Sequence, residues 1–433
     1  MKRLICIVYY LFPFLGIAQQ ELTLEEAVAI ALENNYDIRL VSKDVAIADN
    51  NVSIGNAGML PSVSADVSAA AGIQNTTQTL LSGETRAVRG NRTRSSAYGA
   101  SLDWTIFDGL QMFTRYEQLK ELKALGDANL KASILATVYD VVSSYFDLVQ
   151  QQQLINATQT ALDLSAFRHQ TAENRYQIGR ASKLEVLAAS VDLNTDTTNL
   201  LRQRDQFRST QIRLNELLAR DVNMVFSVAD TIVIGNDLYY DVLSQQAKEL
   251  NPTLQSAIVN HRIAQLELKR IKGERYPIVN LSSAYTRSQS QTALGFSTQS
   301  KNNGFSYGIS ASMNIFNGFQ QRRNERNAEF TMEAAEIEVD KVRQNIEAQL
   351  LAAYQTYLMN LELVRLEERN KDIAQQNMEI TLEKFKLGSI APLEFREAQR
   401  NFVDAVARFS TAQYQAKLAE ITLHQIAGTL KMK

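Results

Sequence analysis

Two carboxylates near the C-terminus have a spacing that predicts a shared role. Glu394 and Glu397 are three residues apart, shortly after Pro392, at the start of a predicted helix. Residues three apart on a helix lie on one face, so the two carboxylates together would attract cations. Such charges also stabilise a helix N-terminus by roughly a few tenths of a kcal/mol each. A third carboxylate, Glu185, occupies the matching place 209 residues earlier. The spacing alone leaves both roles open.

No set of residues in the sequence predicts catalysis or a cofactor. The three histidines, His169, His261 and His424, are isolated on helical patterns with no partner at metal-ligand spacing. The single cysteine, Cys6, falls in the N-terminal leader, so the mature chain would contain neither disulfides nor cysteine ligands. The sequence also lacks a phosphate-binding loop and a nucleophile elbow. We therefore expect no enzyme, no bound metal and no cofactor.

The first residues have the composition of a secretory leader. Lys2 and Arg3 precede an apolar stretch over 4–14, and small residues at Gly16 and Ala18 fit a cleavage site. A signal peptide over 1–18 is therefore predicted. Its removal takes away Lys2 and Arg3 and changes the formal charge from −2 to −4, which argues against nucleic acid as a partner. No later segment approaches eighteen consecutive apolar residues, so we expect no membrane-spanning helix.

The remainder of the sequence consists of two similar repeats. The predicted repeats cover 19–219 and 241–433, with a linker at 220–240. Early in the repeats, matching positions are 216 residues apart, as for Asn35 with Asn251 and Pro61 with Pro277. Later positions are 209 residues apart, as for Trp104–Gly109 with Met313–Gly318 and Tyr176–Gly179 with Phe385–Gly388. The change of seven residues indicates an insertion between Pro61 and Phe107. Chance similarity rarely keeps register over so many positions, so we infer an internal duplication.

Each repeat contains a long helical pattern and a shorter returning one. Apolar residues recur at threes and fours in a narrow stripe typical of a coiled-coil seam, as at Leu130, Ile134, Val138, Val141, Tyr145 and Leu148. The predicted long helices cover 111–174 and 320–383, and each is roughly 95 Å long at 1.5 Å per residue. Returning helices are predicted over 182–219 and 392–428. Thr23 and Glu26 form a capping box before a short N-terminal helix, and another helix is predicted from about 35 to 58.

Strict alternation of apolar and polar residues marks a strand hairpin in each repeat. The hairpins are predicted over 62–107 and 278–316, and the clearest alternation runs from Phe305 to Ile315. Each run is about 10 residues, long enough to cross a bilayer as a tilted strand. The segments 74–94 and 288–304 are rich in polar residues and resemble the outer loops of membrane barrels. Alternation alone also fits a half-buried soluble hairpin.

Four membrane strands require partner chains. Open strand edges are not tolerated in hydrocarbon, so the sheet would close only through oligomerisation. Two chains would give eight strands and a filled barrel, whereas three would give twelve and leave a lumen. A conducting role favours three chains without proving it.

Four motifs in order make this sequence resemble the TolC family of outer membrane factors over essentially the whole mature chain. They are Thr23-Leu-Glu-Glu-Ala-Val28, Leu60-Pro61, Trp104-Thr-Ile-Phe-Asp-Gly109 and Tyr176-Gln-Ile-Gly-Arg-Ala-Ser-Lys-Leu-Glu-Val-Leu187. The resemblance implies a mainly helical homotrimer with a twelve-stranded barrel in the outer membrane lipid and a twelve-helix barrel in the periplasm. It also implies that substrates reach this channel from an inner-membrane transporter through a periplasmic adaptor.

The resemblance assigns roles to the two turns between the long and returning helices. It implies adaptor contacts at Tyr176, Gly179, Arg180, Ala181 and Ser182 in the first repeat, and at Phe385, Gly388, Ser389 and Ile390 in the second. Glu394 and Glu397, with Glu185 as a further candidate, would ring the periplasmic entrance and favour cations. In the second repeat, Ile390-Ala391-Pro392 replaces the polar residues of the family pattern.

One other function fits part of the sequence. A periplasmic coiled-coil scaffold or adaptor without a membrane pore would account for the leader and the long helices. It would not account for amphipathic strands at equivalent places of both repeats. Extraction with carbonate separates the two readings, because a barrel leaves the membrane only with detergent.

Overall fold

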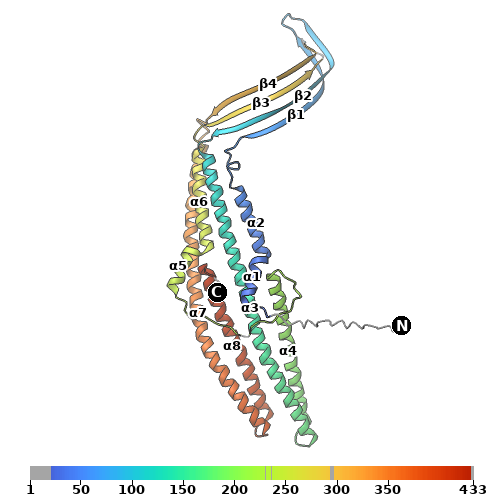
Figure 1. Cartoon of the computed structure of the whole chain (residues 1–433), viewed down its shortest axis with the longest axis vertical. Coiled ribbons are helices and arrows are strands. Elements are labelled where there is room, and N and C mark those ends of the chain that lie inside the picture. Colours follow the sequence, from blue (N-terminus) through green and yellow to red (C-terminus); the bar gives the residue numbers. More distant parts are fainter. Residues whose placement is uncertain (1–20, 230, 236, 293–296, 431–433) are drawn as a thin grey trace, which may run out of the picture. The chain divides into compact units, whose positions relative to one another are not determined.

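The computed structural model describes residues 21–229, 231–235, 237–292 and 297–430. The predicted leader, 1–18, lies outside these residues. The described residues form two compact units, unit 1 from the described parts of 1–42, 130–252 and 343–433, and unit 2 from those of 43–129 and 253–342. Both units draw on both predicted repeats, because the long helices α3 (Gln111–Gln177) and α7 (Gln320–Lys386) contribute residues to each (Figure 1).

Unit 2 contains a sheet of four antiparallel strands in the order β1-β2-β3-β4. The strands are β1 (Ser62–Thr79), β2 (Thr85–Phe107), β3 (Ile278–Gln291) and β4 (Gln299–Ser312). Among the described residues, β1 and β4 are the two edges of this sheet, and each pairs on one side only. β1 and β2 form one hairpin and β3 and β4 another, and β2 pairs with β3 to join them.

The predicted outer loops are shorter than their composition suggested. In the segment 74–94, β1 continues to Thr79 and β2 begins at Thr85. The turn between them is closed by Leu80 N donating to Glu84 O at 2.8 Å, with Gly83 at φ 81°. Threonine favours strands even in polar stretches, so the hairpin extends where polarity alone predicted a loop. Likewise β3 and β4 reach into the predicted loop 288–304.

The helices of unit 2 include α6 (Pro252–Gly273) and most of α2 (Tyr36–Asn51). The helix predicted from 35 to 58 ends at Asn51, seven residues early. Asn56 explains this end, because its Nδ2 donates to Asn51 O at 3.0 Å and its backbone N donates to Ser53 Oγ at 3.1 Å. Such local side-chain bonds compete with helix continuation.

Unit 1 has the main hydrophobic core, which α3 shares with α1 (Leu24–Asn34), α4 (Lys183–Leu217) and the segment after it. The fully buried members include Val28, Val141, Leu148, Val149, Leu214 and Leu218. The predicted capping box opens α1, with Thr23 Oγ1 accepting from Glu26 N at 3.2 Å. Tyr145 Oη donates to Leu22 O at 3.0 Å, which ties α3 to the chain before α1.

Two asparagines of unit 1 make matching contacts in the two halves of the sequence. Asn35 Nδ2 donates to Leu217 O, and Asn251 Nδ2 donates to Ile426 O, both at 2.9 Å. Each accepting carbonyl lies at the C-terminal end of a returning helix, α4 or α8 (Pro392–Ala427). Asn251 follows α5 (Tyr240–Leu250) as Asn35 follows α1. Each asparagine therefore satisfies a carbonyl that has no partner within its helix.

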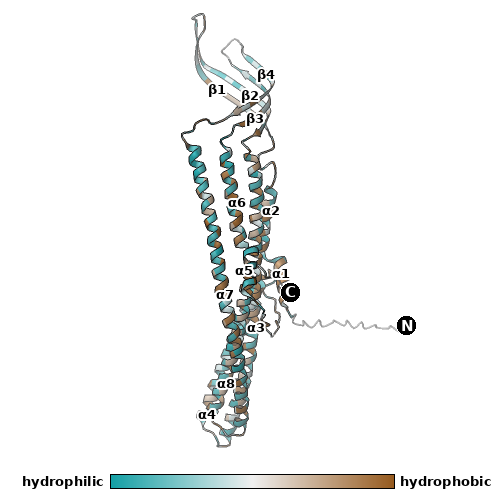
Figure 2. Ribbon diagram, turned by 90° about the vertical axis from the view of Figure 1, so that its left-hand side faces the viewer, coloured by the Kyte–Doolittle hydropathy of each residue, from teal (hydrophilic) through white to brown (hydrophobic). Residues whose placement is uncertain are grey.

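By length and composition alone, one described helix, α3, contains a stretch apolar enough to cross a membrane. More than half of that stretch, 56%, is buried within the protein. Figure 2 shows hydrophobic and hydrophilic residues interleaved along the lower helices rather than gathered into one apolar segment. We attribute the hydropathy of α3 to its core positions, such as Val138, Val142 and Phe146.

Candidate functional site at the two helix turns

The first turn joins α3 to α4 through a glycine in the left-handed conformation. Gly179 has φ 72°, and Arg180 N donates to Arg175 O at 2.7 Å to close the end of α3. This is the hydrogen bond of a Schellman cap, for which glycine is the favoured residue. Ser182 then begins α4, with its Oγ accepting from Glu185 N at 3.3 Å. Tyr176 is exposed and has the Lys183 ammonium 5.3 Å from its ring centroid.

The second turn repeats this backbone with a different helix start. Gly388 has φ 70°, and Ser389 N donates to Lys384 O at 3.0 Å. The following helix, α8, begins with Pro392 at its first position, and Ala391 makes no side-chain cap. Proline suits this position because its missing N–H would have no partner within the helix.

Phe385, predicted to contact an adaptor, is buried inside the single chain, with 1% of its surface exposed. Its ring stacks on Phe395 at 5.1 Å between centroids and 12° between planes, and it meets the edge of Phe167 at 6.5 Å. The Arg175 guanidinium carbon lies 5.3 Å from the same ring centroid. Phe385 therefore supports the second turn from within, whereas Gly388 and the residues around it lie at the surface.

The three predicted carboxylates differ in exposure. Glu394 and Glu397 are exposed on the first turns of α8, and Glu397 pairs with Arg400 at 3.0 Å. Glu185 is half-buried and lines a cavity of about 280 Å³ with Arg168, Asp192 and Arg396. The fold brings Glu394 and Glu397 together at one helix start, but Glu185 belongs to the start of α4.

The helices next to the turns contain a buried charge cluster that the sequence analysis did not predict. Arg168 of α3 donates to Asp192 of α4 at 2.6 Å, and their side chains are only 4% and 7% exposed. Arg396 of α8 contacts the other carboxylate oxygen of Asp192. Burial lowers the pKa of Arg168, and the neighbouring Arg396 lowers it further, whereas Asp196 raises it. The cluster therefore connects three helices through a single carboxylate. No sequence signal pointed to it, because charges on helices are usually solvated.

Gln399 of α8 extends this cluster by hydrogen bonds into α3. Its Nε2 donates to Ala161 O at 2.7 Å and to Ser165 Oγ at 2.9 Å, and Ser165 in turn donates to Asp196. A cavity of about 490 Å³ lies beside these groups. The polar contacts bring α8 against the α3–α4 hairpin, so a shift of α8 would have to break buried bonds.

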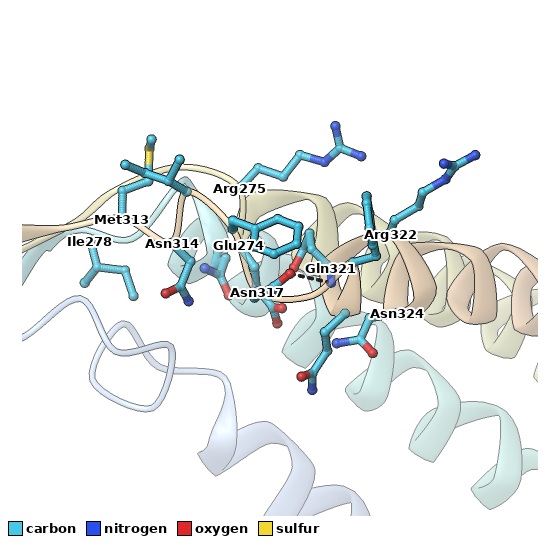
Figure 3. A pocket seen from close by; sticks show the side chains of 14 residues that line it. Glu274, Arg275, Ile278, Met313, Asn314, Asn317, Gln321, Arg322 and Asn324 are labelled. Atoms are coloured by element: carbon cyan, nitrogen blue, oxygen red, sulfur yellow. Dashed lines mark hydrogen bonds between the residues drawn. The ribbon is translucent and has the colours of Figure 1, made fainter.

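A third hollow lies in unit 2, where the strands meet the helices. Its volume is about 910 Å³, and its lining includes Gln111, Arg275, Phe316, Gln321 and Arg322 (Figure 3). Asn317 lies three residues before α7 begins, and its Oδ1 accepts from Gln321 N at 3.3 Å. The hollow combines apolar, amide and charged side chains. Within the described part of the chain, no three His, Cys, Asp or Glu side chains gather in a way that could hold a metal ion.

Comparisons with known proteins agree with this architecture. The sequence profile of the outer membrane efflux protein family matches residues 27–220 and 243–429. The chain is 21% identical over 422 residues to the outer membrane efflux protein BepC of Brucella suis, with 94% of this chain and 86% of that protein covered. It is 18% identical over 308 residues to the outer membrane protein TolC of Vibrio cholerae, covering 70% of each.

Solved structures share the fold. The CmeC outer membrane channel of Campylobacter jejuni superposes with a TM-score of 0.77 at 16% identity, over 94% of this chain and 85% of that one. The outer membrane protein VceC of Vibrio cholerae gives 0.72 at 14% identity, over 94% and 96%.

Proposed function

The chain belongs to the outer membrane efflux protein family, and on that premise we propose that three copies form a passive export duct through the outer membrane. Each copy would contribute four strands to a twelve-stranded β-barrel and its long helices to an α-barrel in the periplasm. Substrates would enter from a periplasmic adaptor and an inner-membrane transporter. In this proposal the chain has a cleaved leader over 1–18, binds no cofactor and catalyses no reaction.

The observation that carries the proposal is the sheet with one apolar face and two unpaired edges. Backbone groups on the outer sides of β1 and β4 have no strand partner within the described chain. Hydrocarbon does not tolerate such edges, so insertion requires β4 of one copy to pair with β1 of the next. Exposed side chains at the base of the sheet support this, since Ile315, Phe316 and Phe319 are 90%, 73% and 69% exposed in the single chain.

The internal duplication is supported by the helices themselves. Helices α3 and α7 each have 67 residues and begin 209 residues apart. The two glycine turns and the two asparagine contacts recur as well. A duplicated protomer in a trimer would give six similar strand hairpins and six similar helix pairs, which suits a closed tube.

The two helix turns are our proposed entrance and adaptor surface. Tyr176, Gly179, Arg180, Ala181 and Ser182 would meet the adaptor in the first turn. The second turn would offer Gly388, Ser389 and Ile390, with Phe385 holding them from behind.

Conductance tests the duct directly. Detergent-purified protein of trimeric mass should give small, stable, cation-selective steps in a planar bilayer. Carbonate extraction of membranes should leave the protein in the pellet. A chain that carbonate removes, or a monomer that never conducts, would favour the periplasmic scaffold instead.

The carboxylates at the start of α8 give a sharper test of the entrance. Three copies would place six carboxylates around one opening, so Glu394→Gln with Glu397→Gln should reduce selectivity for cations. Folding stability should change by no more than about 0.5 kcal/mol, because both side chains are exposed. Reversal potentials in asymmetric potassium chloride measure the effect. Glu383→Gln, an exposed change at the end of α7, is the matched control. Equal selectivity in the double variant and the wild type would remove these residues from the entrance.

A further inference from the structure

The register of the sheet assigns its side chains to two chemically different faces. Partners on one face include Val63 with Leu102, Trp104 with Leu281, and Leu281 with Ile309. This apolar face also presents Tyr98, Tyr285, Phe305 and Tyr307. The other face is small and polar, as the pairs Ser64 with Ser101 and Ser282 with Gly308 illustrate.

Outside the register shift between Gln74 and Thr76 and the hairpin tip beyond it, where Arg86 pairs with Gln78, the paired strands hold four cations, all on the apolar face. Each is fixed by its pairing, with Arg92 opposite Ile73, Arg94 opposite Ala71, Arg287 opposite Tyr98 and Lys301 opposite Gln289. Over the same paired segments, the polar face holds Asp66 and Asp103 and no cation. This distribution is unusual, because cations normally lie on a solvated polar face and not on an apolar one.

The four cations gather toward one end of the apolar face, where Arg287 is opposite Tyr98 and the other three lie beyond the aromatic residues. On β2, Arg94 is twelve residues from Ile106, which is roughly 40 Å along the strand and about 30 Å of height at a tilt near 40°. That height matches the hydrocarbon thickness of a bilayer. On β3 and β4 the sequence changes from Tyr285 to Arg287 and from Phe305 to Lys301. In an inserted barrel, these cations would lie at the level of the outer headgroups.

Their spacing forms two close pairs. Arg287 and Lys301 are on adjacent strands and two residues apart in register, so their Cα atoms are about 8 Å apart. Arg92 and Arg94 are about 7 Å apart on one strand, and Arg94 is roughly 14 Å from Arg287. All four side chains are exposed, and no ion pair is formed by any of them within the described residues. Guanidinium groups without a carboxylate partner are suited to bidentate contact with phosphate.

We propose that Arg92, Arg94, Arg287 and Lys301 form a binding site for the phosphates of phosphorylated glycolipids in the outer leaflet. The inference rests on the proposed barrel, because only an inserted sheet presents this face to lipid. We expect a phosphorylated lipid as the ligand because the same face of the sheet offers an apolar surface for acyl chains and, next to it, cations for phosphates. The two cation pairs suit a headgroup that carries two phosphates. Aromatic residues next to the cations on this face, such as Tyr98 and Tyr285, would lie at the membrane interface, where amphipathic rings are favoured.

Lipid binding to the detergent-purified trimer tests the site. Native mass spectrometry with diphosphoryl lipid A, and with the same lipid after dephosphorylation, separates phosphate recognition from acyl-chain binding. We expect the phosphorylated lipid to bind more tightly. Each cation removed should weaken that binding roughly fivefold at low salt. The variants are Arg92→Gln with Arg94→Gln, and Arg287→Gln with Lys301→Gln. Arg86→Gln with Arg89→Gln is the matched control, because it removes two exposed arginines of β2 outside this cluster.

The outcomes separate this site from the duct. A trimer that conducts but binds both lipids equally, or that loses as much affinity in the control, overturns the site and leaves the duct intact. Displacement of the lipid by an equal concentration of inorganic phosphate would also overturn it, because phosphate recognition would then not depend on the membrane face. A preparation without trimers or conductance overturns the duct, and the site with it.

Discussion

The two helical hairpins of unit 1 have the same turn and opposite interiors. Their glycines, Gly179 and Gly388, have φ values of 72° and 70°. In the α3–α4 hairpin, the buried pair Arg168 and Asp192 lies inside. At the positions 209 residues later, the α7–α8 hairpin has Asn377 and Asn401, both exposed.

The α7–α8 hairpin instead has an aromatic interior at its turn. Phe385 and Phe395 stack there and are fully buried. The first hairpin has Tyr176 and Val186 at those positions, and Tyr176 is exposed. One backbone turn is therefore compatible with either a charged or an aromatic interior. The two hairpins also contact each other, because α8 of the second hairpin contributes Arg396 to the charged cluster of the first.

The largest expected effect comes from removing the aromatic stack. Phe395→Ala leaves a cavity against Phe385, and we expect a loss of roughly 3–5 kcal/mol in the free energy of unfolding. Heat-induced loss of the helical circular dichroism signal measures the shift. Leu393→Ala is the control on the same turn, because Leu393 is 73% exposed. If both variants lose equal stability, the stack does not hold the second turn.

The charged interior should be nearly as sensitive. Asp192→Asn removes the carboxylate shared by Arg168 and Arg396 and leaves Arg168 buried without a counter-charge. We expect the free energy of unfolding to fall by roughly 3 kcal/mol, the lower end for a broken buried ion pair, because Arg396 is half-exposed and remains hydrated. The control is Asp205→Asn, an exposed change on the same helix. Replacing the buried pair together, by Arg168→Met with Asp192→Leu, should restore most of the loss. An effect of Asp192→Asn no larger than the control's would contradict a structural role.

The comparison also shows what the sequence could predict. Periodicity located both long helices and both strand hairpins, because a narrow apolar stripe and strict alternation are local patterns that persist over many residues. Glycine at 179 and 388 marked the turns for the same local reason. The Arg168–Asp192–Arg396 cluster was not predictable, since it depends on which faces of three helices meet. The burial of Phe385 was missed similarly, because its partner Phe395 lies on the next helix, and Tyr176, its counterpart in the first repeat, is exposed.

A smaller effect is expected where the two returning helices begin. Ser182 caps α4 through Glu185 N, whereas Ala391 gives α8 no side-chain cap. We expect Ser182→Ala to cost about 1 kcal/mol, and Ala391→Ser to stabilise by up to about 1 kcal/mol. Thermal unfolding midpoints of the two variants should therefore move in opposite directions. If Ala391→Ser destabilises the protein, Pro392 has already fixed this helix start in a geometry that a serine cap does not fit.

The smallest effect concerns pH and the far ends of the returning helices. Near the end of α8, burial lowers the pKa of His424 below its ordinary value of 6.5, with Glu420 opposing and Lys417 adding to the shift. The matching residue of α4 is Asn215, which does not titrate and donates from Nδ2 to Met224 O at 2.9 Å. The folded state therefore favours neutral histidine, and the unfolded chain binds the proton more readily.

This stability contribution is present above pH 6.5 and is lost as the pH falls through the lowered folded value. Unfolding midpoints should therefore drop between pH 7.5 and 5.5, and His424→Asn should reduce that drop. Asn215→Ala should lower stability at every pH without altering the slope, because it removes hydrogen bonds and no proton site. If His424→Asn keeps the wild-type slope, the acid sensitivity arises elsewhere, and the two helix ends differ in packing but not in their response to protons.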